Sequence, residues 1–224
     1  MTTTAIIITI VLCVVAFFVC AIPFGLIFAK HLGNVDVRTV GSGNIGTTNV
    51  TRAAGKKVGA LTLLCDVLKG FVMTFGGKLI LAHFVEGGAD ELLLRGNCGV
   101  LLCWIYFACI CGHCFSPYLG FKGGKGIAVG LGGALGFMPG VAVTMLLVFL
   151  AVALPTAYVS LGSACAAVSL PVLGLLLGGA HIDSAIVLCL TAAVVLFRHR
   201  ENLIRLTRGE ESKFSFKKSG ETRS

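Results

Sequence analysis

Charged residues are scarce in this chain of 224 residues. Asp, Glu, Lys and Arg together make up 12% of it, whereas hydrophobic residues make up 56%. A water-soluble domain has about 25% charged residues with which to cover its surface. The shortage excludes an ordinary soluble protein, and we predict an all-α integral membrane protein, because helices satisfy their own backbone groups in lipid.

Acidic residues are fewer than basic ones, with 10 Asp and Glu against 18 Lys and Arg. The carboxylates are too few and too scattered for the metal site of a CDP-alcohol-type phosphotransferase. We therefore expect no metal and no cofactor, and we expect no nucleic acid as a partner. No internal repeat stands out along the chain.

Cysteines are numerous, at 10, but most lie inside apolar runs, where they behave as small hydrophobic residues. Cys111 and Cys114 have the spacing of thiol–disulfide oxidoreductases. Those enzymes present the first cysteine at a helix start on a soluble scaffold, whereas this pair ends an apolar run. Redox chemistry is not expected here.

Seven apolar runs follow one another along a single domain that comprises residues 1–224. Each run approaches the length of a membrane span, about 20 residues, although the glycine-rich fourth run is short. We expect the polar tail to begin at residue 199. The predicted spans are residues 5–28, 58–84, 97–113, 126–138, 140–155, 158–178 and 183–198.

Basic residues lie in alternate loops, which predicts the orientation of the chain. The first loop, the third loop and the tail carry Lys30, Arg38, Arg52, Lys56, Lys57, Lys122, Lys125, Arg198, Arg200, Arg205, Arg208, Lys213, Lys217, Lys218 and Arg223. The intervening loops carry Glu86, Asp90, Glu91, Asp183 and only Arg95. An odd number of spans puts every basic segment on the cytoplasmic side, with the N-terminus outside.

The first polar segment, residues 38–57, is rich in glycine. Glycine lets the backbone approach a ligand and point its N–H groups at an anion. Ser42, Asn44 and Asn49 add neutral hydrogen-bonding groups, and Arg52 offers a bidentate fork for phosphate. The alternative is a flexible loop whose charges only determine topology.

The second polar segment contains Lys122, Gly123, Gly124, Lys125 and Gly126 directly before an apolar run. Free N–H groups at a helix start, together with glycines and cations, form a general anion site. The spacing is not that of a Walker A loop, since no Ser or Thr follows the lysine. The alternative is a glycine hinge with two lysines extended to the interface.

The third polar segment is residues 198–213. If it is helical, His199, Asn202 and Arg205 share one face. The alternative is a basic amphipathic helix on anionic lipid. Within the predicted spans, Ser160 and Ser163 either donate into a site or bond to their own helix.

Two charged residues, Asp66 and Lys69, fall inside a predicted span and are three residues apart. An intramembrane charge is costly and is usually paired or functional. At this spacing the two can satisfy each other, so we expect a structural pair that orients the first loop.

Together the three segments resemble the PlsY family of acyl-phosphate:glycerol-3-phosphate acyltransferases. The resemblance extends over the full length of the chain and is carried by Gly41–Asn49 with Arg52, Gly112-His113 with Phe121–Gly126, and Arg198-His199 with Asn202, Arg205-Leu206 and Gly209. It implies transfer of a fatty acyl group from acyl phosphate to the 1-hydroxyl of glycerol 3-phosphate, giving 1-acylglycerol 3-phosphate. This is the first step of phospholipid synthesis, at a bacterial inner membrane with the site facing the cytoplasm.

The resemblance also implies roles for single residues. His199 and Asn202 are expected at the catalytic centre, and Lys122, Gly123, Gly124, Lys125 and Gly126 at the acyl phosphate. The expected glycerol-3-phosphate ligands are Ser42, Asn44, Asn49, Arg52, Lys122, Ser160 and Arg205. The expected partners are the two substrates, membrane lipid and an enzyme that produces acyl phosphate.

Two questions stay open at this point. His199 has a suitable intrinsic pKa for a general base, with Asn202 orienting it, but the substrate phosphate can also take the proton. A transporter of a phosphorylated solute is the alternative function. A transporter is expected to place its site near the middle of the membrane, often between internal repeats.

Overall fold

A computed structural model describes residues 2–84 and 97–214, and within these residues the regular structure is entirely helical. This confirms the all-α prediction. The α-helices are α1 (Thr3–Ala21), α2 (Phe24–Gly33), α3 (Thr47–Ala54), α4 (Lys56–Phe84), α5 (Asn97–Cys114), α6 (Ile127–Phe137), α7 (Pro139–Thr156), α8 (Val159–Leu176) and α9 (Ile182–Thr207). Two short 3₁₀ turns, Val37–Thr39 and Pro117–Leu119, lie in the connections.

Six helical stretches in the described residues are long and apolar enough to cross a membrane. The fourth predicted span, residues 126–138, corresponds to α6, which has only 11 residues. At about 1.5 Å per residue, α6 covers about half of the ~30 Å hydrocarbon layer. The multi-pass character is thus confirmed, whereas the count of seven and the orientation stay predictions. Of the charges used to predict orientation, Glu86, Asp90, Glu91, Arg95, Lys217, Lys218 and Arg223 lie outside the described residues.

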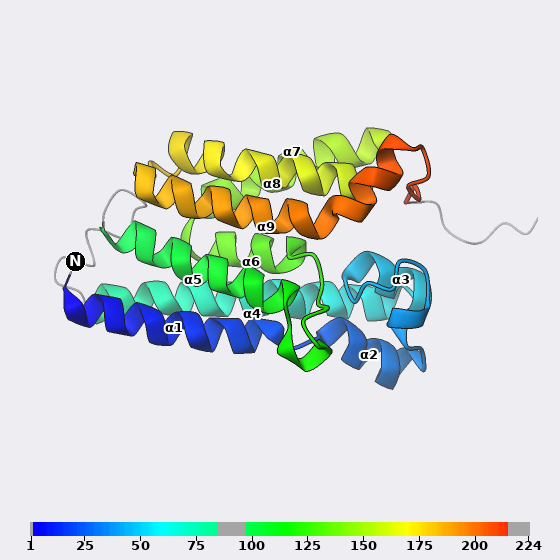
Figure 1. Cartoon of the computed structure of the whole chain (residues 1–224), viewed down its shortest axis with the longest axis horizontal. Coiled ribbons are helices and arrows are strands. Elements are labelled where there is room, and N and C mark those ends of the chain that lie inside the picture. The colour runs from blue at the N-terminus through cyan, green and yellow to red at the C-terminus, as the bar shows by residue number, and fades with distance from the viewer. Residues whose placement is uncertain (1, 85–96, 215–224) are drawn as a thin grey trace, which may run out of the picture.

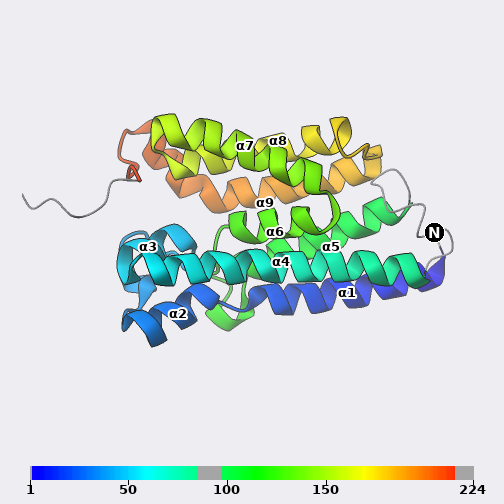
Figure 2. The ribbon, with the colours of Figure 1, turned by 180° about the vertical axis from the view of Figure 1, so that it is seen from behind.

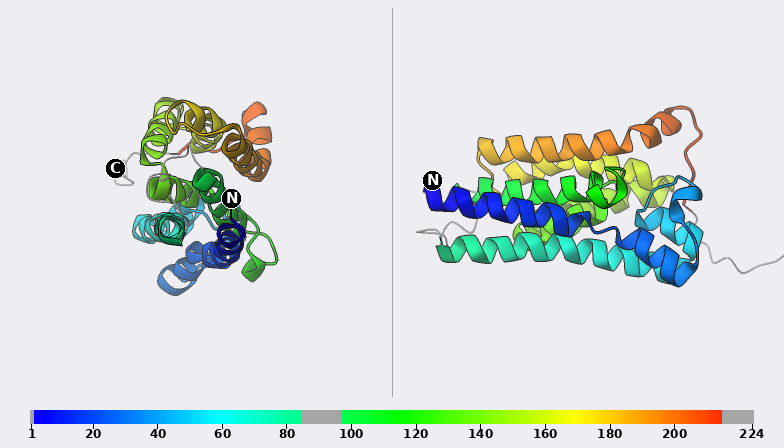
Figure 3. Two further views of the ribbon diagram at one scale, coloured as in Figure 1. Left: turned by 90° about the vertical axis from the view of Figure 1, so that its left-hand side faces the viewer. Right: turned by 60° about the horizontal axis from the view of Figure 1, so that its bottom comes forward.

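The helices form two groups with α5 and α6 between them (Figure 3). Helices α1 and α4 pack on α5 and α6, and α7, α8 and α9 pack on one another, joined to the rest through α5 and α6. Glycines permit the close approach of α4 and α6, since a Cβ on Gly132 would overlap the carbonyl of Val67. Such small residues are typical of helix interfaces in membranes.

Two helical stretches differ at their ends from the predicted spans. The expected span 5–28 is divided at Ile22 and Pro23, and a second helix, α2, continues to Gly33. Pro23 has no N–H to donate, so a regular helix does not continue through it. At the other end, α9 runs past residue 198 to Thr207, so much of the expected tail is helical.

The three polar segments gather at one end of the molecule. Helix α3, the loop before α6 and the last turns of α9 lie toward the end opposite the N-terminus (Figures 1 and 2). The segments were predicted to share one face, and the structure brings them together there. The side of the membrane that this face meets stays a prediction.

Candidate active site

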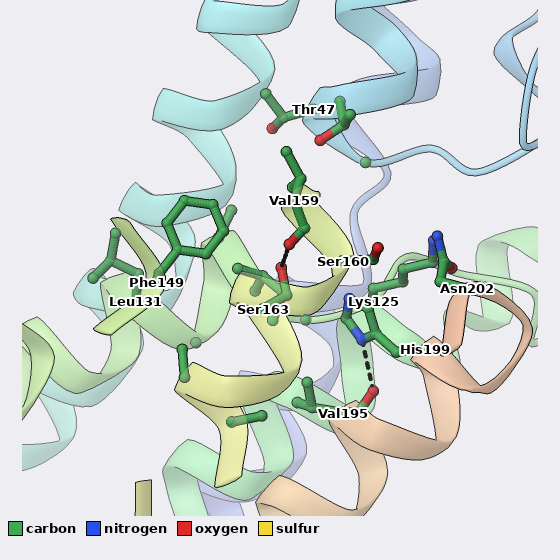
Figure 4. Close-up of a pocket in the computed structure, with 18 of the residues that line it drawn as sticks. Thr47, Lys125, Leu131, Phe149, Val159, Ser160, Ser163, Val195, His199 and Asn202 are labelled. Atoms are coloured by element: carbon green, nitrogen blue, oxygen red, sulfur yellow. Dashed lines mark hydrogen bonds between the residues drawn. The ribbon is translucent and has the colours of Figure 1, made fainter. Parts of the chain in front are cut away.

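A cavity of about 720 Å³ lies between the two groups of helices. One end is polar, and its lining includes Ser42, Asn44, Arg52, Lys125, Ser160, His199, Asn202, Arg205 and Glu211. The rest is apolar, and its lining includes Leu131, Met145, Leu146, Phe149, Leu150, Ala153, Ala167 and Leu170. Figure 4 shows Lys125, Ser160, His199 and Asn202 on one side, with Leu131 and Phe149 on the other. Such a cavity can hold an amphiphile with an anionic head and an apolar tail.

The side-chain amide of Asn49 holds the backbone of the first polar segment together. Its amide nitrogen donates to the carbonyls of Val37 and Val40, both at 3.0 Å, and to that of Asn44 at 2.9 Å. Its amide oxygen accepts the N–H of Ser42 at 3.2 Å. An amide group has two N–H donors and one carbonyl oxygen, so this side chain has no donor left for a ligand. Ser42 and Arg52, by contrast, are exposed at the mouth of the cavity.

The glycine–lysine loop, residues 122–126, is held by the backbone of α5 and by a side chain of α9. The N–H of Gly124 donates to the carbonyl of His113 at 3.0 Å, and that of Gly123 to Cys114 at 3.2 Å. From the other side, Arg198 donates to the carbonyls of Gly123 at 2.6 Å and Gly124 at 3.1 Å. The loop is thereby attached to both groups of helices.

The two lysines of this loop have different surroundings. Lys125 lines the cavity, whereas the side chain of Lys122 is exposed and does not line it. The structure therefore does not bring Lys122 to the position expected of a substrate ligand. Burial lowers the pKa of Lys125 to about 8, so this ammonium is charged at neutral pH but easily deprotonated above it.

His199 is buried in α9, and one of its ring nitrogens is already engaged. Its Nδ1 lies 2.8 Å from the carbonyl oxygen of Val195 (Figure 4). A carbonyl only accepts, so Nδ1 carries the proton in the neutral ring, and Nε2 is left with a free lone pair. This is the tautomer that a general base requires.

Glu211 is a site residue that the sequence analysis did not include. Its carboxylate accepts from the Asn202 amide at 2.7 Å and from the Arg205 guanidinium at 2.9 Å. Burial favours the neutral acid, but the hydrogen bonds from Asn202 and Arg205 outweigh it and lower the pKa of Glu211. Asn202 was expected to orient His199, but its recorded hydrogen bond goes to Glu211. The only signal in the sequence was an acidic residue within a basic tail.

The two serines of α8 differ in what they contact. Ser160 is buried at the polar end of the cavity, as expected for a residue that donates into the site. The hydroxyl of Ser163 donates to the carbonyl of Val159 at 2.8 Å, within its own helix. Ser160 thus faces the site, whereas Ser163 bonds to its own helix.

Asp66 and Lys69 form the expected ion pair, with Lys69 Nζ 2.7 Å from Asp66 Oδ1. The other contacts of Lys69 lead to the α1–α2 break at Ile22 and to His113, not to the first loop. The pair therefore lies next to His113, close to the glycine–lysine loop. We had expected it to orient the first loop instead.

Sequence comparison assigns this chain to a family. The family model described as glycerol-3-phosphate acyltransferase matches residues 10–209. The chain belongs to the glycerol-3-phosphate acyltransferase family. A member from Rhizobium etli is 39% identical over 204 residues, which cover 91% of this chain and 90% of that protein. A member from Aquifex aeolicus is 38% identical over 203 residues, which cover 91% of this chain and 97% of that protein.

Solved structures of the family share the fold. PlsY, described as an integral membrane glycerol 3-phosphate acyltransferase, matches in its glycerol 3-phosphate form with a TM-score of 0.80 and 36% identity. That match covers 92% of this chain and 96% of PlsY. The lysophosphatidic acid form matches with a TM-score of 0.78 and 35% identity, over 92% of this chain and 95% of PlsY. The resemblance inferred from the three segments is thus confirmed at the level of the family.

Proposed function

We propose that this protein transfers a fatty acyl group from acyl phosphate to the 1-hydroxyl of glycerol 3-phosphate, giving lysophosphatidic acid and phosphate. The observation that carries the proposal is one continuous cavity with a cationic mouth and an apolar interior. Membership in the glycerol-3-phosphate acyltransferase family supports the acceptor. Its relatives in the solved structures are described in forms with glycerol 3-phosphate and with lysophosphatidic acid.

The acceptor is proposed to bind at the mouth, between α3 and the end of α9. Arg52 supplies a guanidinium for its phosphate, and Ser42 and Ser160 supply hydroxyl groups for its oxygens. Arg205 is already paired with Glu211, so its role is to shape this wall and to contribute positive potential. Asn44 lines the same wall, and Asn49 supports it from behind.

The donor is proposed to place its phosphate at Lys125 and its acyl chain in the apolar interior. Burying the chain beside Leu131, Phe149 and Leu170 contributes about 0.8 kcal/mol per CH₂ group. Lys125 offers a positive charge at the point where the phosphate leaves. The loop before α6 holds this lysine between the two substrates.

The proposed reaction is a direct acyl transfer. The 1-hydroxyl oxygen attacks the carbonyl carbon, a new C–O ester bond forms, and the C–O bond to the phosphate breaks. The hydroxyl proton passes to Nε2 of His199, and the electron pair of the broken bond leaves with the phosphate. Because acyl phosphate is an activated mixed anhydride, no covalent enzyme intermediate is needed. Both substrates are anions, so the convergent cations of the mouth reduce their repulsion and orient the attack.

The setting proposed for this reaction is a bacterial inner membrane, with the mouth of the cavity facing the cytoplasm. Lys30, Arg38, Lys56 and Lys57, near the mouth, are exposed, which fits the basic bias of cytoplasmic loops. The donor's tail then stays in the bilayer while its phosphate meets a soluble acceptor. A partner enzyme that produces acyl phosphate is part of this proposal.

A donor comparison tests the proposal. The purified protein in detergent is given glycerol 3-phosphate with either palmitoyl phosphate or palmitoyl-CoA, and the product is identified by mass spectrometry. We expect lysophosphatidic acid from palmitoyl phosphate only. Product from palmitoyl-CoA alone would overturn the choice of donor, and activity that requires sealed vesicles would favour a transporter.

A further inference from the structure

A buried charged cluster lies beneath the glycine–lysine loop. It consists of Asp66 and Lys69 from α4 and His113 from the last turn of α5, whose exposed fractions are 2%, 5% and 4%. Asp66 and His113 also line the cavity. Nothing in the reaction proposed above uses these three residues.

Lys69 holds the cluster together and determines the tautomer of the histidine. Its ammonium group lies 2.7 Å from Asp66 Oδ1, 2.9 Å from the carbonyl oxygen of Ile22 and 3.2 Å from His113 Nδ1. An ammonium group has N–H donors and no acceptor, and this one forms an ion pair with Asp66 and hydrogen bonds to Ile22 and His113. His113 Nδ1 therefore accepts, and the ring carries its proton on Nε2.

The Nε2 edge of His113 lies against Gly124. A Cβ atom on Gly124 would overlap Nε2, so no other residue type fits beside this ring without displacement. A Cβ on Gly123 would instead overlap the backbone carbonyl of His113. The ring thus supports the loop at Gly124, directly before Lys125.

A buried ion pair is a costly way to fill this space. Replacement of such a pair by apolar residues of similar volume is often neutral or stabilising, so packing alone does not call for it. An ammonium group held by Asp66 and by the carbonyl of Ile22 does, however, hold an imidazole in one orientation, as hydrogen-bonded carboxylates do for the histidine ligands of metals.

We infer that Asp66, Lys69 and His113 are positioning residues for the phosphate of the acyl donor. They act through Gly124 and set the place of Lys125. The inference rests on the proposed function, since the loop is assigned there to the donor phosphate. In this proposal the three residues keep the loop in one position whether or not substrate is bound.

The test begins with His113→Ala in the full-length protein. The KM for palmitoyl phosphate is expected to rise about tenfold, the loss expected when one hydrogen bond to a charged group is misplaced. The KM for glycerol 3-phosphate is expected to stay unchanged, and the unfolding temperature is expected to fall, because the buried ammonium of Lys69 loses an acceptor. A fall in unfolding temperature with no change in either KM would overturn the inference, because a merely structural role predicts that result.

A pair of neighbouring glycines provides a matched control. Gly124→Ala is expected to raise the KM for palmitoyl phosphate, and the double variant with His113→Ala is expected to do no worse than His113→Ala alone, because the overlap with the ring is gone. Gly123→Ala meets backbone instead, so His113→Ala is expected not to compensate for it. Equal compensation at both glycines would contradict a specific contact between the ring and Gly124.

A charge-free variant keeps the inference testable if single substitutions unfold the protein. Asp66→Leu together with Lys69→Met leaves no unpaired buried charge. We expect this double variant to keep its unfolding temperature while the KM for palmitoyl phosphate rises; an unchanged KM would overturn the inference. The unmodified protein is assayed first. If it does not use palmitoyl phosphate, the proposed function fails; if it does and the variants match it, only this inference fails.

Discussion

His199 Nδ1 donates to the carbonyl of Val195, 2.8 Å away and one turn earlier in the same helix. The bond is made within α9 and does not depend on any other element. It presents an unprotonated Nε2 in the wall of the cavity, in the same orientation for as long as α9 is folded. This relation makes His199 the side chain best prepared to take a proton.

His199→Ala is therefore expected to lower kcat about 100-fold, since a positioned general base contributes at least that factor. The KM values are expected to change little, because the ring is not proposed to bind either phosphate. Steady-state kinetics with both substrates at saturation measure this effect. His31→Ala is the control, since His31 is exposed on α2 and does not line the cavity. A variant that loses affinity but keeps turnover would assign the proton to the substrate phosphate.

The two lysines of the loop are expected to differ. Lys125→Ala should raise the KM for acyl phosphate about tenfold or more, the loss of one charge-assisted bond to phosphate, whereas Lys122→Ala should have little effect. The KM of the unmodified protein should also rise with pH, because the ammonium of Lys125 loses its proton near pH 8. The pH profile of KM between pH 7 and 9 measures this. The Lys125→Arg variant, whose charge does not titrate there, is expected to give a flat profile. A profile that rises equally in both would assign the titration to another group.

Ser42 and Asn49 are expected to separate binding from folding. Asn49→Ala should lower the free energy of unfolding by about 1–3 kcal/mol, because buried backbone carbonyls lose their donor. Ser42→Ala should leave that free energy unchanged and raise the KM for glycerol 3-phosphate. Thermal unfolding in detergent, with kinetics on the same samples, distinguishes the two. The opposite pattern would assign Asn49 to the substrate.

Glu211 is expected to contribute to stability only when it is ionised. Its pKa is lowered in the folded protein, so the stabilisation is present above the ordinary pKa of about 4.3 and is lost as pH falls through the lower folded value. Glu211→Gln should therefore lower the unfolding temperature at pH 7, and the difference from the unmodified protein should shrink toward pH 3. Glu210→Gln is the control, since Glu210 is exposed beside it. Equal effects of the two substitutions would contradict the role of the bridge to Asn202 and Arg205.

The apolar part of the cavity is expected to select the acyl chain by length. Ala167 lines this part, so Ala167→Phe should shorten the chamber and lower kcat/KM for long-chain acyl phosphates. Each CH₂ group excluded costs about 0.8 kcal/mol, or about fourfold. Val168→Phe is the matched control, because Val168 is 55% exposed on the outer face of α8. A ladder of acyl phosphates of increasing length measures the effect. An equal loss at every length would show that Ala167 does not border the chain.

Much of this site could be predicted from the chain itself. Glycine, asparagine and basic residues stand in three polar segments between apolar runs, and the structure brings all three to one cavity. The position of the break at Pro23 and the extent of α9 could not be predicted as well. A predicted span ends where apolar composition ends, but a helix can continue into polar sequence, as α9 continues through His199 and Asn202 to Thr207.

Residue types alone could not distinguish ligands from supports. Asn44 and Asn49 look alike in the sequence. The side-chain amide of Asn49, however, is hydrogen-bonded to backbone groups of Val37, Val40, Asn44 and Ser42. Lys122 and Lys125 also look alike, yet only Lys125 lines the cavity. Glu211 could not be selected, because its partners, Asn202 and Arg205, reach it only after the chain turns back at Gly209, whose φ is +71°.

The sequence by itself determined that this protein belongs in a membrane, that it is helical, and which polar segments are candidates for its site. These properties follow from composition and from local order along the chain. Only the tertiary structure decided which lysine faces the cavity, and that Lys69 of α4 meets His113 of α5. The role of a buried polar group depends on the partner within about 3 Å of it, and for Lys69 and Arg198 such partners lie far away in the sequence, at His113 and Gly123.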